Sequence, residues 1–286
     1  MDMEGIRQEC DRVIDLLRYI WNSSPKDIVK KIRLKLSGVW GNCAEEQHLR
    51  EAPRFVAGEA RLLDRKIEYV DAPSYLFMRD EIFVSEIYRF TCNKQNPVII
   101  DCGSNIGLSI IYFKKLYPDC ILLCFEPDVN IFKVLSENVS AFGFQGVTLY
   151  NKAIWERETK VAFIQEGADG GRIGDGSPEC SCCHVETTVL SQYLSVQVDF
   201  LKIDIEGAEA EVLEECREGL VNVNLLFLEY HSTHGEPQRL GRILDILTEA
   251  GFRYYIEHIG VTSKHPFVRL HTCNNFDNQL NIYAYR

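Results

Sequence analysis

Two acidic residues, Asp101 and Glu126, each follow a short apolar segment typical of a strand buried on both faces of a parallel sheet. Gly103 and Gly107, just after the first segment, predict a tight turn into a helix. A carboxylate at the end of the second strand can accept two hydrogen bonds from a ribose diol. Together the two strand ends predict a pocket for one adenosine-bearing cofactor.

The spacing of the glycines indicates which cofactor this is. A dinucleotide-binding loop has the pattern G-x-G-x-x-G, which seats a pyrophosphate on a helix N-terminus, but this loop reads G-x-x-x-G. Asn105 adds a polar side chain at the rim of the loop, and the acid Asp101 suits an ammonium group. The pattern favours a cofactor without phosphates that carries an amino-acid head and an adenosine.

A second group of titratable residues follows two later apolar segments: Asp204 and Glu206 come after the first, Glu229 and His231 after the second. The carboxyl ends of parallel strands face the same crevice, so we expect these residues beside the cofactor. His231 is the first candidate for a general base, because a neutral imidazole can accept a proton near neutral pH. Asp204 and Glu206 are alternatives, and a polar cap on a strand end is the plain structural alternative.

Metal binding is the less favoured interpretation of two clusters. Asp204, Glu206 and Glu229 could gather a divalent cation, since hard cations prefer several carboxylate oxygens, but their spacing alone does not define a ligand shell. The segment Cys180–His184 has adjacent cysteines and no second ligand pair at a suitable spacing. We therefore assign no metal ligand and interpret Cys180–His184 as a plain loop.

The elements that position these residues alternate between strand and helix, which predicts an α/β fold with a parallel sheet and right-handed crossovers. The last two predicted strands have only a loop between them, which indicates an antiparallel terminal pair. Three predicted strands begin at Val98, Ile121 and Val147, and four more span residues 198–207, 225–231, 252–259 and 280–286. Two predicted helices begin at Leu108 and Val129, and two more span residues 208–216 and 237–250.

The rest of the chain is predicted to surround this sheet. Helical spacing indicates an N-terminal helical extension over residues 1–55, followed by one domain over 56–286. The basic second helix of the extension is an accessory helix or, as an alternative, a membrane or partner surface. Further predictions are short strands around Arg65–Val70 and Tyr75–Phe77, a helix over Ile82–Phe90, a hairpin-like insert at Val161–Ile164 and a flexible loop over the glycine-rich residues 167–179.

Composition excludes several classes of function. The chain has 286 residues, 46% of them hydrophobic, which suffices for a proper core. A net charge of −11 argues against nucleic acid and acidic membranes as partners, and no apolar stretch is long enough for stable membrane insertion. Without a secretory signal at the start, we expect a cytoplasmic protein with reduced thiols. Four of its 11 cysteines lie in apolar patterns and should pack as small hydrophobes: Cys102, Cys120, Cys124 and Cys216.

Four segments resemble, in order, the motifs of the FkbM-type methyltransferases, which use S-adenosylmethionine. The segments are VIIDCGSNIGLS, CFEPD, NKAIW and DFLKIDIEGAEAEVL, and the resemblance extends from about Tyr69 to Tyr285. It implies a class I methyltransferase fold, which is a Rossmann-like, mostly parallel sheet of seven strands with an antiparallel last strand. It also implies methylation of a hydroxyl group on a sugar, a glycan or a secondary metabolite.

The resemblance implies a role for each residue of the motifs. The loop after the first strand would surround the methionine part of the cofactor, and Glu126 would hold the ribose hydroxyls. Pro127 and Asp128 would border the adenine, while Ala153 and Ile154 would line its ring. The loop residues are Asp101, Gly103, Ser104, Asn105 and Gly107, and the catalytic candidates remain His231, Asp204, Glu206 and Glu229.

Two other functions remain as alternatives. A nicotinamide-dependent oxidoreductase would share the sheet and Glu126 but needs the middle glycine that is absent here. A non-catalytic cofactor-binding module would have side chains filling the crevice near Asp204 and His231. Tyr75, Tyr230, His234 and Glu236 either line an acceptor pocket or pack in an ordinary way. The identity of the acceptor and the oligomeric state, including a homodimer, stay open.

Overall fold

The structure is a computed structural model that describes residues 38, 39, 41, 43–168, 170–174 and 182–286. It divides into two compact units, Met1–Ile87 and Tyr88–Arg286, which we describe separately. The helices predicted before residue 38 lie outside the described residues. The predicted domain boundary after residue 55 stays a prediction.

The described residues of the first unit form a hairpin and two α-helices. Strands β1 (Gly58–Leu62) and β2 (Arg65–Tyr69) pair antiparallel, which confirms the strand predicted near Arg65. The helices are α3 (Cys43–Glu51) and α4 (Ala72–Arg79), and the π-helix η1 (Asp80–Ser85) follows α4 directly.

Two predictions in this unit were wrong. The strand predicted at Tyr75–Phe77 lies inside α4, because Asp71 caps that helix and accepts a hydrogen bond from the backbone N–H of Ser74 at 3.0 Å. The helix predicted to reach Phe90 ends much earlier. Glu86 adopts a left-handed conformation with φ 54°, which closes η1 after Ser85.

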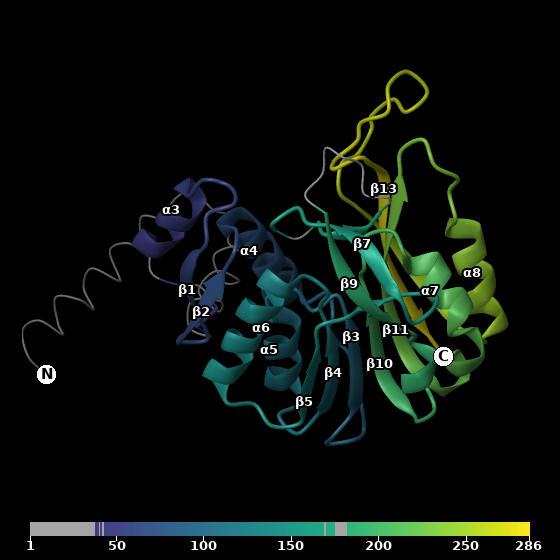
Figure 1. Cartoon of the computed structure of the whole chain (residues 1–286), viewed down its shortest axis with the longest axis horizontal. Helices are drawn as coiled ribbons and strands as arrows, with labels where there is room; N and C mark the ends of the chain where they lie inside the picture. The colour runs from purple at the N-terminus through teal and green to yellow at the C-terminus, as the bar shows by residue number, and fades with distance from the viewer. Residues whose placement is uncertain (1–37, 40, 42, 169, 175–181) are drawn as a thin grey trace, which may run out of the picture. The chain divides into compact units, whose positions relative to one another are not determined.

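The second unit is built on a seven-stranded sheet in the order β12-β13-β11-β10-β3-β4-β5 (Figure 1). The pairs among β5, β4, β3, β10 and β11 are parallel, whereas β13 runs antiparallel to both of its neighbours. This confirms the mostly parallel α/β sheet with an antiparallel last strand. The strands are β3 (Val98–Cys102), β4 (Ile121–Phe125), β5 (Val147–Tyr150), β10 (Val198–Ile203), β11 (Val223–Thr233), β12 (Arg253–Ile259) and β13 (Phe276–Tyr285).

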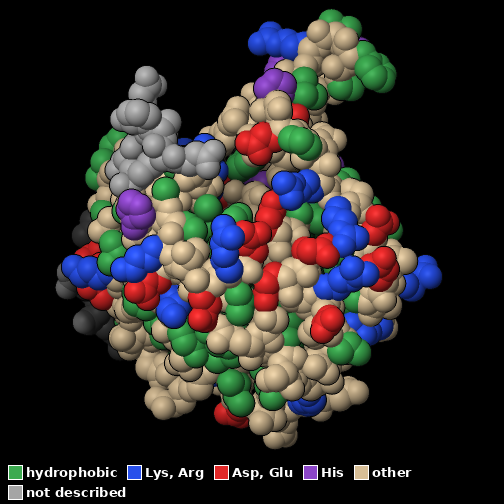
Figure 2. Space-filling view, turned by 45° about the vertical axis from the view of Figure 1, so that its right-hand side comes forward, with side chains coloured by type: hydrophobic (Ala, Val, Ile, Leu, Met, Phe, Trp, Pro, Cys, Tyr) green, Lys and Arg blue, Asp and Glu red, His purple; other side chains and the backbone are tan. Residues whose placement is uncertain are grey.

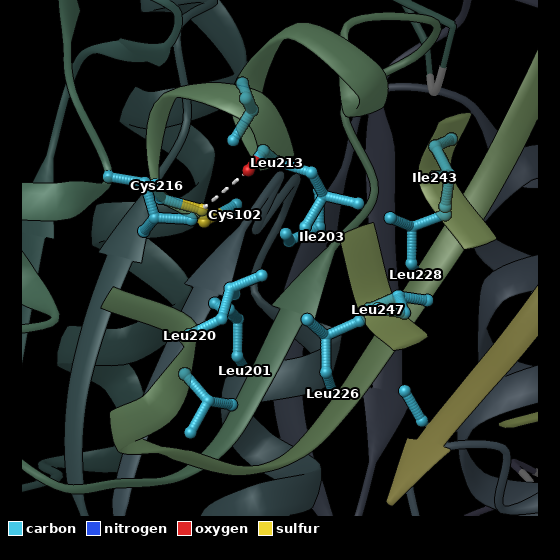
Figure 3. Close-up of a cluster of buried hydrophobic side chains, with 14 of the residues drawn as sticks. Cys102, Leu201, Ile203, Leu213, Cys216, Leu220, Leu226, Leu228, Ile243 and Leu247 are labelled. Carbon is cyan, nitrogen blue, oxygen red and sulfur yellow. Dashed lines mark hydrogen bonds between the residues drawn. The ribbon is translucent and has the colours of Figure 1, made fainter. Parts of the chain in front are cut away.

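Helices cover both faces of this sheet. On β10, Leu201 and Ile203 point to one face, where they join a buried apolar cluster with residues of α7 and α8 (Figure 3). The ring of Phe200, on the other face, is tilted against the ring of Phe113 in α5, with 5.3 Å between the ring centroids. The sheet is therefore a middle layer with a core on each side. The helices are α5 (Leu108–Leu116), α6 (Val129–Phe142), α7 (Glu209–Glu215) and α8 (Leu240–Glu249), with the short 3-10 helices η2 (Ser191–Tyr193) and η3 (Arg217–Asn222).

A second, four-stranded sheet is inserted between β5 and β10, in the order β6-β9-β7-β8. The hairpin-like insert predicted at Val161–Ile164 is confirmed and is larger than expected. The segment Cys180–His184 was predicted as a loop, but residues 182–184 begin β9; residues 180 and 181 lie outside the described residues. The strands are β6 (Ala153–Ile154), β7 (Lys160–Ile164), β8 (Arg172–Ile173) and β9 (Cys182–Thr188).

The four cysteines predicted to pack as small hydrophobes are all buried and free, and burial raises the pKa of each thiol. On the face of the molecule in Figure 2, acidic and basic side chains lie side by side. The ion pairs between α7 and α8, such as Arg242 with Glu214, have the same mixed character. Among the described residues, no helix has the length and apolar character needed to cross a membrane.

Candidate active site

The loop from Gly103 to Gly107 is fixed to the ends of two neighbouring strands. The backbone N–H groups of Gly103 and Ser104 both donate to the carbonyl of Phe125, at 3.0 and 2.9 Å, at the end of β4. The hydroxyl of Ser104 donates to the carbonyl of Asp101 at 3.1 Å. The loop is therefore held by backbone hydrogen bonds, independently of any ligand.

The structure explains why glycine occupies positions 103 and 107. Gly103 has φ 86°, and a Cβ there would lie 1.8 Å from the carbonyl oxygen of Asp204. The sequence analysis expected close approach to a ligand, but the close approach shown here is to the end of β10. Gly107 has φ 92° and precedes α5, where a Cβ would lie 2.8 Å from Leu135 of α6. Gly107 thus lets two helices pack together.

Glu126 lies at the end of β4 and is 6% exposed. One carboxylate oxygen accepts the backbone N–H of Asn105 at 3.0 Å, and the other accepts that of Asp128 at 2.9 Å. Burial raises the pKa of Glu126 to about 8, although these hydrogen bonds oppose the shift. Each oxygen keeps a lone pair for a further donor, so the carboxylate can accept the two hydroxyls of a ribose.

The inserted sheet borders this carboxylate. Gln165 donates to the carboxylate of Asp128 at 2.9 Å, and the side chain of Asn105 donates to the carbonyl of Ala168 at 3.4 Å. Both contacts come from the segment that follows β7. We call Glu126 and the loop from Gly103 to Gly107 the cofactor end of the site, because the sequence analysis predicts the cofactor there.

Most of the predicted cofactor residues are buried by the protein itself. Ala153 and Ile154 form β6 and are 4% and 2% exposed, each packed in an apolar cluster. The carboxylate of Asp101 is fully buried. It accepts the hydroxyl of Ser109 at 2.5 Å and lies 3.3 Å from Nζ of Lys202. Pro127 is half-buried, and its carbonyl accepts a hydrogen bond from Asn151.

Lys202 joins the cofactor end to the next strand of the sheet. Its Nζ donates to the carbonyl of Gly103 at 2.7 Å and lies 3.3 Å from the carboxylate of Asp204. Burial opposes its charge, but Asp204 and Asp101 raise the pKa of Lys202 well above its usual value. The sequence analysis gave Lys202 no role. The signal in the sequence that could have indicated this role is a lysine in a buried strand, between two strand ends that carry carboxylates.

The four catalytic candidates lie together at the end of β10 and on β11. Nε2 of His231 lies 3.5 Å from the carboxylate of Glu206 and 3.3 Å from that of Glu229. Oxygens of Asp204 and Glu206 and a ring nitrogen of His231 all lie within 4.8 Å of one another. We call these four residues, Asp204, Glu206, Glu229 and His231, the acceptor end.

Glu209, at the first turn of α7, orients the imidazole. Its carboxylate lies 3.1 Å from Nδ1 of His231 and also accepts the backbone N–H of Gly207 at 2.9 Å. Burial tends to lower the pKa of His231, but Glu206, Glu209 and Glu229 raise it well above its usual value. Burial raises the pKa of Glu206 to about 8. The sequence analysis gave Glu209 no role.

A cavity of about 70 Å³ lies beside His231 and Glu209 and is also lined by Tyr230 and Glu236. It has room for a few water molecules but not for a sugar. His234, another candidate for the acceptor pocket, is exposed and lies 3.5 Å from Asp277. Tyr75 belongs to the first unit, so its place relative to this site is not described.

Comparison with curated proteins finds relatives that are named as methyltransferases. The chain is 28% identical over 177 residues to the 2-O-methyltransferase NoeI of Sinorhizobium fredii, which covers 54% of this chain and 72% of that protein. It is 25% identical over 162 residues to Methyltransferase 1 of Beauveria bassiana, covering 48% of this chain and 65% of that protein. The match thus spans slightly less than two thirds of the Beauveria protein.

Among solved structures, the chain is similar to a methyltransferase FkbM from Methylobacillus flagellatus, with 18% identity and a TM-score of 0.47. That likeness covers 70% of this chain and 46% of the other. A family profile described as the methyltransferase FkbM domain matches residues 101–254, which is more than half of the chain and includes both ends of the site. By this match, the chain belongs to the FkbM methyltransferase family.

Proposed function

We propose that this chain transfers a methyl group from S-adenosylmethionine to a hydroxyl oxygen of a sugar, a glycan or a secondary metabolite. The observation that carries the proposal is the position of Glu126. Its carboxylate, held by two backbone N–H groups, lies beside the glycine loop and at the same sheet edge as the acceptor end. A ribose-binding carboxylate and a cluster of proton acceptors are thereby placed along one line of strand ends.

The residues at the cofactor end fit this cofactor. In its ionised form, a carboxylate that already accepts two hydrogen bonds can take only donors, and the hydroxyls of a ribose are donors. When bound, S-adenosylmethionine supplies an electrophilic methyl group on a positively charged sulfur. We propose that Glu126 holds the ribose, that Asp128 and Pro127 border the adenine, and that the loop from Gly103 to Gly107 surrounds the methionine part.

In this proposal Asp101 acts on the cofactor indirectly, through Lys202. Because its carboxylate is fully buried and paired with Lys202, it reaches a ligand only through the lysine and the Gly103 carbonyl that the lysine binds. Ala153 and Ile154 have almost no free surface, so any contact with adenine would involve a small part of either side chain. Asp101 therefore positions the loop in this proposal.

The acceptor end supplies the groups that take the hydroxyl proton. Methyl transfer to an oxygen requires removal of that proton at or before transfer, and it requires the oxygen in line with the methyl group. Asp204 and Glu206 have side chains that are 24% and 18% exposed, and a Cβ on Gly207 would meet no atom within 4 Å. These observations favour an accessible acceptor end over the filled crevice of a non-catalytic module.

His231 does not face this accessible side directly. Its side chain is 1% exposed, and Nε2 points to Glu206 and Glu229. We propose that the proton passes first to the carboxylates of the cluster, with His231 behind them. A hydroxyl acceptor is supported by the name of the relative NoeI, a 2-O-methyltransferase. The net charge of −11 supports an acceptor other than nucleic acid.

Two measurements test the proposal. Calorimetric titration with S-adenosylmethionine should show binding of one molecule per chain, and titration with NAD should show none. A panel of hydroxylated sugars, glycans and secondary metabolites, incubated with cofactor labelled in the methyl group, should then identify an acceptor. Tight binding of NAD, or no heat with S-adenosylmethionine, would overturn the proposal. Label found on nitrogen or carbon would overturn the hydroxyl acceptor alone.

A further inference from the structure

The carboxylates at the acceptor end outnumber the positively charged side chains that pair with them. Four carboxylates lie there or pair with His231, namely those of Asp204, Glu206, Glu209 and Glu229. In the part of the chain that the structure describes, Lys202 is the only permanently charged cation paired with any of them. Carboxylates brought this close repel one another strongly when they are partly out of water. This arrangement favours a further cation among them.

His231 provides a second, independent observation. Its Nδ1 lies 3.1 Å from the carboxylate of Glu209, a geometry in which Nδ1 carries the hydrogen and Nε2 carries a lone pair. Nε2 is buried and has no hydrogen-bond partner, while the carboxylates of Glu206 and Glu229 face it at 3.5 and 3.3 Å. In this neutral tautomer acceptors face an acceptor, so either a second proton on the imidazole or a bound cation must lie between them.

The spacing of these atoms suits a metal ion. Two ligand atoms that each lie about 2.1 Å from one ion are roughly 3 to 4 Å apart. Nε2 of His231 and the nearer oxygen of Glu206 lie 3.5 Å apart, and the set completed by Asp204 stays within 4.8 Å. The contact between Glu209 and Nδ1 is the type of outer hydrogen bond that orients a metal-binding histidine.

We propose that Asp204, Glu206 and His231 bind one divalent cation. Carboxylates suit Mn²⁺ and Mg²⁺, whereas an imidazole suits transition metals, so the mixed set points to a transition-metal ion of the Mn²⁺ type. Glu209 orients the histidine, and Glu229 adds negative charge beside the ion. Cation binding at these residues does not depend on the proposed function.

The catalytic consequence rests on the proposed function. An ion at this point lies where the acceptor hydroxyl is expected, and a hydroxyl in contact with it loses its proton more readily. The cation would also bind Nε2 in its neutral form and separate the carboxylates that now face it. Under this inference His231 is a ligand and does not take part in the proton transfer.

The direct test is a titration of the full chain with MnCl₂ after treatment with a chelator. Free Mn²⁺ gives a paramagnetic resonance signal that bound Mn²⁺ loses, so the signal counts the bound ions. We expect one saturable site per chain, at least tenfold weaker in Glu206→Gln and in His231→Gln. His258→Ala, at an exposed histidine on β12, is the matched control and should bind as the unmodified chain does.

Further readouts separate this inference from the proposed function. Added Mn²⁺ should raise the melting temperature of the unmodified chain but not that of His231→Gln, and circular dichroism should show that the variant is folded. Excess chelator should lower methyl transfer at least tenfold while calorimetric binding of S-adenosylmethionine persists. No saturable Mn²⁺ site, an unchanged site in both variants, or full turnover in chelator would overturn the inference. In that case a proton on His231 is the missing cation.

Discussion

The cofactor end and the acceptor end balance negative charge in different ways. At the cofactor end, the backbone does so, because two N–H groups donate to Glu126. At the acceptor end, within the described chain, no backbone N–H donates to the carboxylates of Asp204, Glu206 or Glu229, and side chains face them instead. A carboxylate held by the backbone is set by the fold, whereas one held by side chains depends on their protonation or on a bound cation.

The largest expected effect is from Gly103→Ala, which would damage both ends at once. The new Cβ would lie 1.8 Å from the carbonyl oxygen of Asp204, at a residue with φ 86°. We expect the free energy of unfolding to fall by about 5 kcal/mol or more, which approaches the whole stability of an average domain. Urea unfolding followed by circular dichroism measures this loss.

Gly143→Ala is the matched control for that substitution. Gly143 also has a positive φ of 65°, but a Cβ there would meet no atom within 4 Å. It should therefore cost only the conformational strain, about 1 to 2 kcal/mol. Equal losses in the two variants would contradict the close contact between the two strand ends.

The second expected effect is from Lys202→Met, which removes the link between the ends and leaves Asp101 and Asp204 without their shared cation. Removing one partner of a buried ion pair typically costs about 3 to 5 kcal/mol. Lys94→Met is the control, since Lys94 is 48% exposed and its partner Asp199 also accepts the N–H of Val98. We expect about 1 kcal/mol or less for the control. A similar loss of stability in both variants would mean that Lys202 does not connect the two ends of the site.

The third prediction concerns the cofactor end alone. Glu126→Gln keeps the shape of the side chain but replaces one acceptor oxygen with a donor, so it should bind a ribose diol poorly. Hydrogen bonds to charged groups are worth about 1.5 to 3 kcal/mol, so we expect the Kd for S-adenosylmethionine to rise about 10- to 100-fold in calorimetry. Glu137→Gln, on the exposed face of α6, should leave the Kd unchanged. An unchanged Kd in Glu126→Gln would remove Glu126 from the cofactor site.

The effect that is smallest per step of the measurement is a dependence of stability on pH. The pKa of Glu126 rises from 4.5 to about 8 in the folded chain, so the folded state keeps a proton that the unfolded state releases. Its contribution to stability is present below the lower value and is lost as pH rises to the upper one. Relative to the unmodified chain, Glu126→Gln should gain about 1 kcal/mol per pH unit across that range. Parallel pH profiles of urea unfolding would contradict this shift.

Much of the fold could be predicted because its signals are local. The apolar segments that end in Asp101 and Glu126 lie next to one another in the sheet, as β3 and β4, and the terminal strands pair antiparallel. The strand predicted at Tyr75–Phe77 failed because aromatic residues also suit a helix once Asp71 caps it. The inserted sheet was underestimated, because β6 and β8 have two residues each and leave almost no pattern.

The sequence predicted which residues form the site, but only some of the contacts between them. The sequence indicated that Asp204, Glu206, Glu229 and His231 gather at one edge, and the structure places them together. It could not indicate that Lys202 touches Gly103, or that Glu209 turns the imidazole. These contacts depend on side-chain directions across strands that are distant in the sequence. The roles assigned to these residues stay proposals.

The position of Lys202 has a thermodynamic consequence. One ammonium group contacts the glycine loop and Asp204, so a ligand that changes its hydrogen bonds at one end changes its ion pair at the other. Binding at the two ends is then linked, and the linkage is reciprocal. Whatever factor the cofactor applies to the affinity of the acceptor end for its ligand, that ligand applies to the affinity for the cofactor. Lys202→Met should bring that factor to one.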